Sequence, residues 1–272
     1  MLEATIVIDN IAQGNLKSEW GFCVYIEYNG KKYLLDTGGS DLYLENAKKL
    51  NIDVADIDYA ILSHAHIDHS KGFPSFFRVN SSAKLYIADT CQENCYFKIG
   101  PIKKYVGIPK GILKAQKERI VSKAGLVMIN PGVYLVPHIE NKLEVIGKRA
   151  HMARKTEHGY IPDNFSHEQS LVFETKKGLV VFNSCSHGGL PNIMKDIQYY
   201  LPNQKVYMTV GGLHLAGMSK KSVQEIACMI KELSIEKVVT GHCTGKKAYQ
   251  ILKDEIGENV QQTHVGMKIE MD

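Results

Sequence analysis

The stretch that most restricts the fold of this chain is LSHAHIDHSKG, residues 62–72, which places three histidines and an aspartate behind an apolar run. The apolar residues before it, 59–62, predict a buried strand, so these donors lie at a strand end. Buried donors without a partner are costly, and a divalent cation satisfies them. The stretch therefore predicts a metal site whose candidate ligands are His64, His66, Asp68 and His69.

The spacing of these donors favours two ions over one. His64 and His66 alternate so that both rings face one side of an extended segment, and Asp68 and His69 follow after a bend. Each of two neighbouring ions then needs further ligands from elsewhere in the chain. Because other predicted strands also end in polar clusters, we expect these ligands to come from His187 and His242. Imidazole and carboxylate suit zinc, iron or manganese.

Strand and helix signals alternate in both halves of the chain, which predicts an α/β fold. The segment 21–38 reads as a hairpin that turns at Asn29-Gly30. Ser219 is a plausible N-cap of a helix that runs to residue 233. We also predict a helix in the basic stretch 109–123 and one closing strand over 260–271.

Composition places the chain among ordinary globular proteins. It has 272 residues, of which 44% are hydrophobic and 23% charged, enough for a single large domain over residues 1–272 with an insertion at about 90–165. The six cysteines form no Cys-x-x-Cys pair. The sequence shows no signal peptide and no run of about 20 apolar residues, so we expect a cytoplasmic protein with reduced thiols and no membrane partner.

Several motifs carry a resemblance to a known family. They are DTG at 36–38, SHAHIDHSKG at 63–72, NSCSHGG at 183–189 and TGHCTG at 240–245. In this order they resemble the metallo-β-lactamase superfamily over nearly the whole chain. EWGF at 19–22, EQSLVF at 168–173 and GGLHL at 211–215 resemble a narrower branch, the dihydropterin-methyl-ribofuranosyl-aminobenzene phosphate synthases of methanopterin biosynthesis, many of whose relatives are simply called metal-dependent hydrolases.

The resemblance implies a four-layer αββα sandwich with two metal ions at one edge and a helical, basic insertion. Carried over by motif, His64, His66 and His187 would hold the first ion. The second would be held by Asp68, His69 and His242, with Asp36 orienting a ligand from behind. We expect Zn²⁺, with Mn²⁺ or Fe²⁺ as alternatives.

The sequence departs from the family at the place of the usual bridging aspartate. It reads Asn183-Ser184-Cys185-Ser186-His187 there, with no carboxylate. Either the Cys185 thiolate bridges the ions or water alone does. The usual third-motif histidine would be sought near His167 and Glu168, so His187 comes from a different place in the chain.

The expected chemistry is hydrolysis by a metal-activated water. Asp68 would act as ligand and orienting base, and His214, which follows two glycines at a strand end, would protonate the leaving group. Cys243 alternates to the other face if its strand continues, and is interpreted as structural. A redox role is disfavoured because His66 stands where the flavodiiron proteins of this fold carry a glutamate.

The segment 98–123 carries eight basic residues against a single acidic one, Glu118, while the whole chain has a net charge of +4. As a lid, it would attract a small anionic substrate such as a phosphate ester; as a solvated face, it would not. The basic residues are Lys98, Lys103, Lys104, Lys110, Lys114, Lys117, Arg119 and Lys123.

Three alternatives to a hydrolase stay open: a transferase like the branch's synthase, a non-catalytic metal-dependent sensor, and an RNA-directed nuclease. We do not expect a nucleic-acid partner, because the charge is modest and basic runs interleaved with aromatic residues are absent. The sequence leaves the physiological substrate and a homo-oligomeric state undecided.

Overall fold

The protein, in a computed structural model that describes residues 1–139 and 142–271, contains two seven-stranded sheets. The first has the order β18 (Lys268–Met271), β1 (Leu2–Ile8), β2 (Cys23–Tyr28), β3 (Lys31–Leu35), β4 (Tyr59–Ile61), β5 (Lys84–Ala88) and β8 (Ile120–Lys123). The second has the order β17 (Val260–Gln262), β16 (Lys237–Thr240), β15 (Val206–Val210), β14 (Gly178–Phe182), β13 (Gln169–Thr175), β10 (Val133–Pro137) and β9 (Val127–Asn130).

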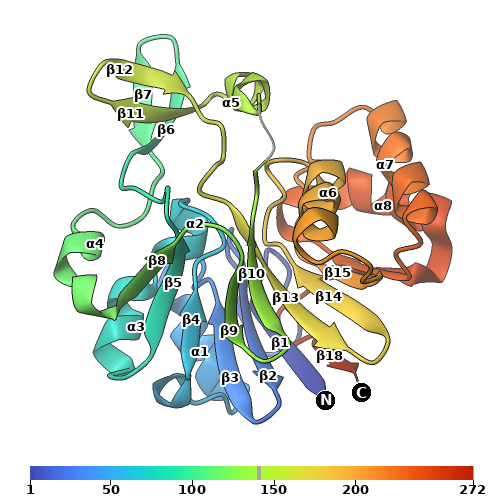
Figure 1. Ribbon diagram of the computed structural model, residues 1–272, viewed down its shortest axis with the longest axis horizontal. Coiled ribbons are helices and arrows are strands. Elements are labelled where there is room, and N and C mark those ends of the chain that lie inside the picture. The colour runs from blue at the N-terminus through green and yellow to red at the C-terminus, as the bar shows by residue number, and fades with distance from the viewer. Residues whose placement is uncertain (140–141, 272) are drawn as a thin grey trace.

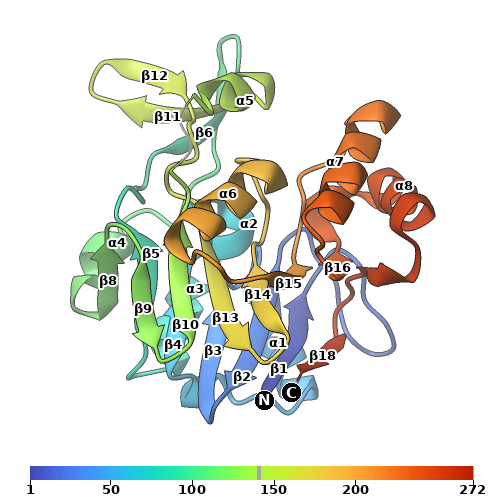
Figure 2. The same cartoon turned by 45° about the vertical axis from the view of Figure 1, so that its right-hand side comes forward.

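The two sheets face each other across a shared apolar core, and helices cover their outer faces (Figures 1 and 2). On the first sheet lie α1 (Leu42–Lys49) and α3 (Phe73–Val79); on the second lie α6 (Leu190–Tyr200), α7 (Lys220–Glu232) and α8 (Lys246–Ile256). Alternation along the strands explains the layers. In β14, Val180 and Phe182 point into the shared core while Val181 packs under the helices. The predicted αββα sandwich is confirmed.

Local signals placed several elements correctly. The predicted hairpin joins β2 to β3, and its turn residues Asn29 and Gly30 both have positive φ, as a two-residue turn of this kind requires. Ser219 caps α7, since its Oγ accepts the backbone N–H of Ser222. Every helix in the described part of the chain is too short or too polar to span a lipid bilayer.

The insertion differs from the prediction. Its main feature is a four-stranded antiparallel sheet, which we call the lid sheet and which stands above one edge of the sandwich (Figure 1). The helix predicted over 109–123 is wrong beyond one turn, α4 (Ile112–Ala115), because residues 120–123 pair with β5 as β8. The lid sheet has the order β12 (Gly159–Pro162), β11 (Met152–Thr156), β6 (Cys95–Ile99) and β7 (Ile102–Tyr105), with α5 (Glu144–Arg149) before β11.

The predicted closing strand is also wrong as a single element. Its first part, β17, pairs with β16 in the second sheet, whereas β18 pairs with β1 in the first. Between them the chain turns, and Gly266 adopts a positive φ. The C-terminal stretch therefore ties the two sheets together.

Candidate metal centre

All six predicted metal ligands meet at one edge of the sandwich, below the lid sheet. His64 follows β4, and the short helix α2 (Ile67–Ser70) carries Asp68 and His69. His187 and His242 follow β14 and β16 of the other sheet. The strands of both sheets thus deliver donors to the same edge, as expected of side chains that follow strand ends.

The six donors form two groups. In the first, the rings of His64 and His66 lie 4.6 Å apart, and His187 lies 4.9 Å from the one and 4.7 Å from the other. In the second, Asp68 Oδ2 lies 3.6 Å from both His69 Nε2 and His242 Nε2. Ligand atoms around a single tetrahedral zinc are separated by roughly 3.3–3.8 Å. The second group therefore already has the spacing of a metal site.

Cys185 lies between the two groups. Its Sγ is 3.2 Å from His69 Nε2. The same sulfur lies within 4.8 Å of donor atoms of His64 and His187 on one side, and of His69 and His242 on the other. The thiol thus stands where the family's bridging aspartate would be sought.

Hydrogen bonds from behind fix how three of the rings face the centre. The Ser63 hydroxyl donates to Asp36 Oδ2 (2.6 Å), so it accepts from His64 Nδ1 (2.8 Å). His69 Nδ1 donates to the same carboxylate at 2.8 Å. His242 Nδ1 lies 3.1 Å from Asn10 Oδ1. Each ring thereby turns its Nε2 inward, the arrangement in which histidine binds metals.

The donor set fits a metal ion because it is buried and unsatisfied. Among the described residues, no hydrogen-bond partner serves Nε2 of His64, His66 and His242, or either ring nitrogen of His187. Each unpaired buried group costs about 1–3 kcal/mol. Burial lowers the pKa of all four rings, that of His66 to about 3, so they are neutral and able to coordinate.

His69 behaves differently. Burial alone would lower its pKa, but the carboxylates of Asp68 and Asp36 outweigh burial and raise it to about 9. Without a cation, the ring therefore holds a proton between two acidic groups. A metal ion supplies the same positive charge at Nε2.

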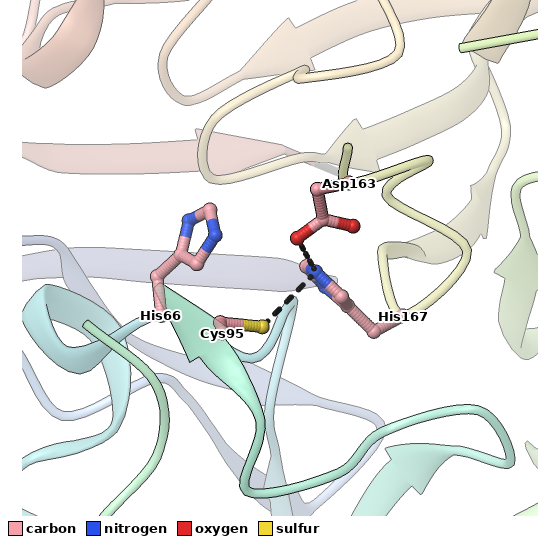
Figure 3. A group of neighbouring side chains, drawn as sticks. All are labelled: His66, Cys95, Asp163 and His167. Atoms are coloured by element: carbon pink, nitrogen blue, oxygen red, sulfur yellow. Dashed lines mark hydrogen bonds and ion pairs between the residues drawn. The ribbon is translucent and has the colours of Figure 1, made fainter. Parts of the chain in front are cut away.

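A second cluster beside the centre contains a histidine, His167, whose two ring nitrogens are hydrogen-bonded without an ion. Figure 3 shows His66, Cys95, Asp163 and His167, whose donor atoms lie within 4.8 Å of one another. His167 Nδ1 accepts the backbone N–H of Ala65 at 3.2 Å, so its proton sits on Nε2. That nitrogen donates to Asp163 at 3.2 Å and also contacts Cys95 at 3.6 Å. His167 is thus engaged elsewhere, and His187 takes the place beside His64 and His66.

Glu168 holds the loop that carries His187. Its buried carboxylate accepts the backbone N–H of His187 at 2.9 Å and that of Gly188 at 3.1 Å. It also lies 3.0 Å from His138 Nδ1. The ring of Phe165 stacks on that of His187, with centroids 4.6 Å apart. The loop after β14 is therefore fixed before any metal binds.

Replacing Glu168 with alanine is expected to lower the free energy of unfolding by about 3 kcal/mol, because three buried donors lose their acceptor. Urea unfolding measures the loss. Glu157→Ala, at an exposed position between β11 and β12, is the control and should change little. A loss below about 1 kcal/mol for Glu168→Ala would contradict this role.

A cavity of about 600 Å³ opens beside the donors. Its lining includes the predicted acid, His214, whose ring lies 4.3 Å from that of His187 and whose buried Nδ1 has no partner among the described residues. The lid sheet contributes Phe97, Lys104 and Met152.

Two cavity residues were not recognised from the sequence. Cys243 lines the cavity instead of facing away, because residues 242–244 form a 3₁₀ turn and strand alternation stops there. Trp20 also lines the cavity and donates its indole N–H to Asp68 Oδ2 at 3.0 Å. The motif EWGF contains this residue, but nothing in its spacing predicts that contact.

The chain is similar to known proteins of the family that its motifs resemble. The sequence model described as "Metallo-beta-lactamase superfamily" matches residues 21–179. A 7,8-dihydropterin-6-methyl-4-(beta-D-ribofuranosyl)-aminobenzene-5'-phosphate synthase of Methanocaldococcus jannaschii is 30% identical, over 90% of this chain and 87% of the relative.

Two solved structures have the same fold as this chain. A metal-dependent hydrolase of the beta-lactamase superfamily superposes with a TM-score of 0.85 and 29% identity, covering 100% of this chain and 99% of the other. A diphosphatase of the PhnP family has a TM-score of 0.55 and 12% identity, covering 100% of this chain and 98% of the other, a likeness of fold alone.

Proposed function

Because the chain belongs to the metallo-β-lactamase superfamily, we propose that it is a metal-dependent hydrolase acting on a small anionic, phosphorylated substrate. The observation that carries the proposal is the convergence of unpaired, neutral imidazoles around Cys185 at the floor of a cavity. Two relatives support the two parts of it: one is described as a metal-dependent hydrolase, and the other as a synthase of a phosphorylated product.

Each ion has a separate set of ligands in this proposal. His64, His66 and His187 would hold the first; Asp68, His69 and His242 would hold the second. Cys185 would be shared, since its sulfur lies within 4.8 Å of donor atoms in both sets. Burial raises the pKa of the Cys185 thiol, whereas coordination to a cation would deprotonate it. When bound, two Zn²⁺ ions, or Mn²⁺ or Fe²⁺, acidify a water molecule and polarise the bond under attack.

Side chains of the protein orient the reacting groups and transfer protons. The Asp68 oxygen that faces His69 and His242, Oδ2, also accepts the indole N–H of Trp20, and this bond holds the carboxylate in place as a ligand and as the base that orients a water molecule. His214 projects into the same cavity with a free ring nitrogen and protonates the leaving group. The lid sheet covers the centre and limits the entry of water.

Turnover of phosphomonoester and phosphodiester probes tests this function. Protein stripped with a chelator is expected to be inactive and to regain activity with Zn²⁺, Mn²⁺ or Fe²⁺. Metal uptake without turnover of any probe would contradict the hydrolase and favour a binding module.

Lys104 is expected to attract the anionic end of the substrate, because it lines the cavity. Lys104→Glu should raise KM for a phosphorylated probe roughly tenfold at low salt and leave kcat nearly unchanged. The control is Lys117→Glu, since the Lys117 side chain is 75% exposed and lies outside the lid sheet. Equal effects of the two variants would show that only the overall charge matters.

A transferase is the second candidate, favoured by the 30% identity to the synthase. The same cations and Lys104 would then hold the phosphate groups of two joined substrates. The reactions are separated by their products: a transferase releases pyrophosphate only when both substrates are present, whereas a hydrolase consumes a single ester.

A further inference from the structure

A second cavity of about 500 Å³ lies next to the one over the metal centre. Trp20 and His242 line both cavities, so they form the wall between them. The second cavity continues along the first turn of α8, where Lys246 and Tyr249 line it. Nothing in the proposed hydrolysis uses this space.

Trp20 is held in place with its ring exposed. The indole N–H donates to Asp68, and the ring lies 5.0 Å from that of His242. The preceding residue, Glu19, is bound through its carboxylate to the Gly39 backbone and the Ser40 hydroxyl. Nevertheless, 60% of Trp20 is exposed. A large aromatic ring kept rigid and uncovered beside a cavity is suited to stacking on a ligand.

The lining of the second cavity indicates what fits there. Tyr249 adds a second aromatic surface, and Ile11 is apolar. Lys246 brings a cation, while the buried Asp9 carboxylate is already engaged by the Thr263 hydroxyl. Aromatic and apolar walls with one cation favour a flat ring that carries a polar or anionic edge.

We propose that the second cavity is a subsite for a planar aromatic ring, and that Trp20 positions this ring relative to the metal centre. The substrate then has two parts: a phosphorylated end over the metal ions and a flat ring beyond Trp20. The position of the phosphate rests on the proposed function, whereas the ring subsite rests on the cavity and its aromatic residues.

Trp20 is the only tryptophan of the chain, so its fluorescence reports directly on the subsite. The probes are adenosine 5′-monophosphate and ribose 5-phosphate, which share the phosphorylated end and differ in the ring, added to Zn²⁺-loaded protein. Adenosine 5′-monophosphate is expected to quench saturably and to bind roughly tenfold tighter. Equal affinities of the two probes would overturn the proposal.

A variant and a third probe complete the test. Tyr249→Leu keeps an apolar side chain at this position of α8, in contact with the core. The variant should lose most of the tenfold preference. A preserved preference would contradict the subsite. Adenosine, which has no phosphate, should still quench Trp20. Quenching by adenosine in a protein without hydrolytic turnover would leave the subsite standing and sink only the proposed function. No quenching by either adenine compound would sink the subsite alone.

Discussion

Replacing His242 with alanine is expected to remove at least one metal ion per chain and to lower kcat/KM on the order of 10³-fold. His242 Nε2 faces Asp68 Oδ2 at 3.6 Å, and Asn10 holds the ring from behind. Losing this nitrogen leaves the second group without one of its histidines. We expect His66→Ala to have an effect of the same size through the first group.

The matched control is His158→Ala, which removes an exposed histidine between β11 and β12. It should keep full metal content and activity. Element-resolved metal analysis and initial rates measure both quantities on the same preparations. Normal metal content in the His242 variant would show that the ring does not coordinate.

Cys185→Ala is expected to produce the second largest effect, a loss of about 10²-fold in kcat/KM with lowered metal content. The reason is that one sulfur serves both ligand sets. In protein loaded with Co²⁺, a cysteine ligand gives a sulfur-to-metal charge-transfer band in the near ultraviolet. That band should be present in the unaltered protein and absent from the variant.

Two further variants sharpen this result. Cys185→Asp restores the carboxylate usual in the family, so it should keep two ions while losing the band. Cys228→Ala, at the exposed cysteine of α7, should change neither. A band that survives Cys185→Ala would assign the sulfur ligand to another residue: Cys243, grouped with Cys185 and His214, or Cys95, grouped with His66.

How far the sequence predicts the structure depends on whether a feature is local. The hairpin at Asn29-Gly30 and the cap at Ser219 follow from the conformations and hydrogen bonds of those residues themselves. The sandwich follows from alternation along strands such as β14, and the ligand positions follow from polar residues at strand ends.

Features that depend on tertiary contacts were missed. Residues 109–123 are rich in helix formers, but an open edge of β5 draws 120–123 into a strand. The satisfied state of His167 depends on the backbone of Ala65, far away in sequence. The role of Trp20 likewise requires Asp68 at 3.0 Å, a distance that spacing along the chain cannot give.

The central claim is that donors from separate strand ends hold two ions on either side of one sulfur. The most direct measurement is a crystal structure of the metal-loaded protein with anomalous scattering at the metal absorption edge. We predict two peaks flanking Cys185 Sγ, one among His64, His66 and His187 and one among Asp68, His69 and His242. A single peak bound by Cys95, Asp163 and His167, with none near Cys185, would contradict the account.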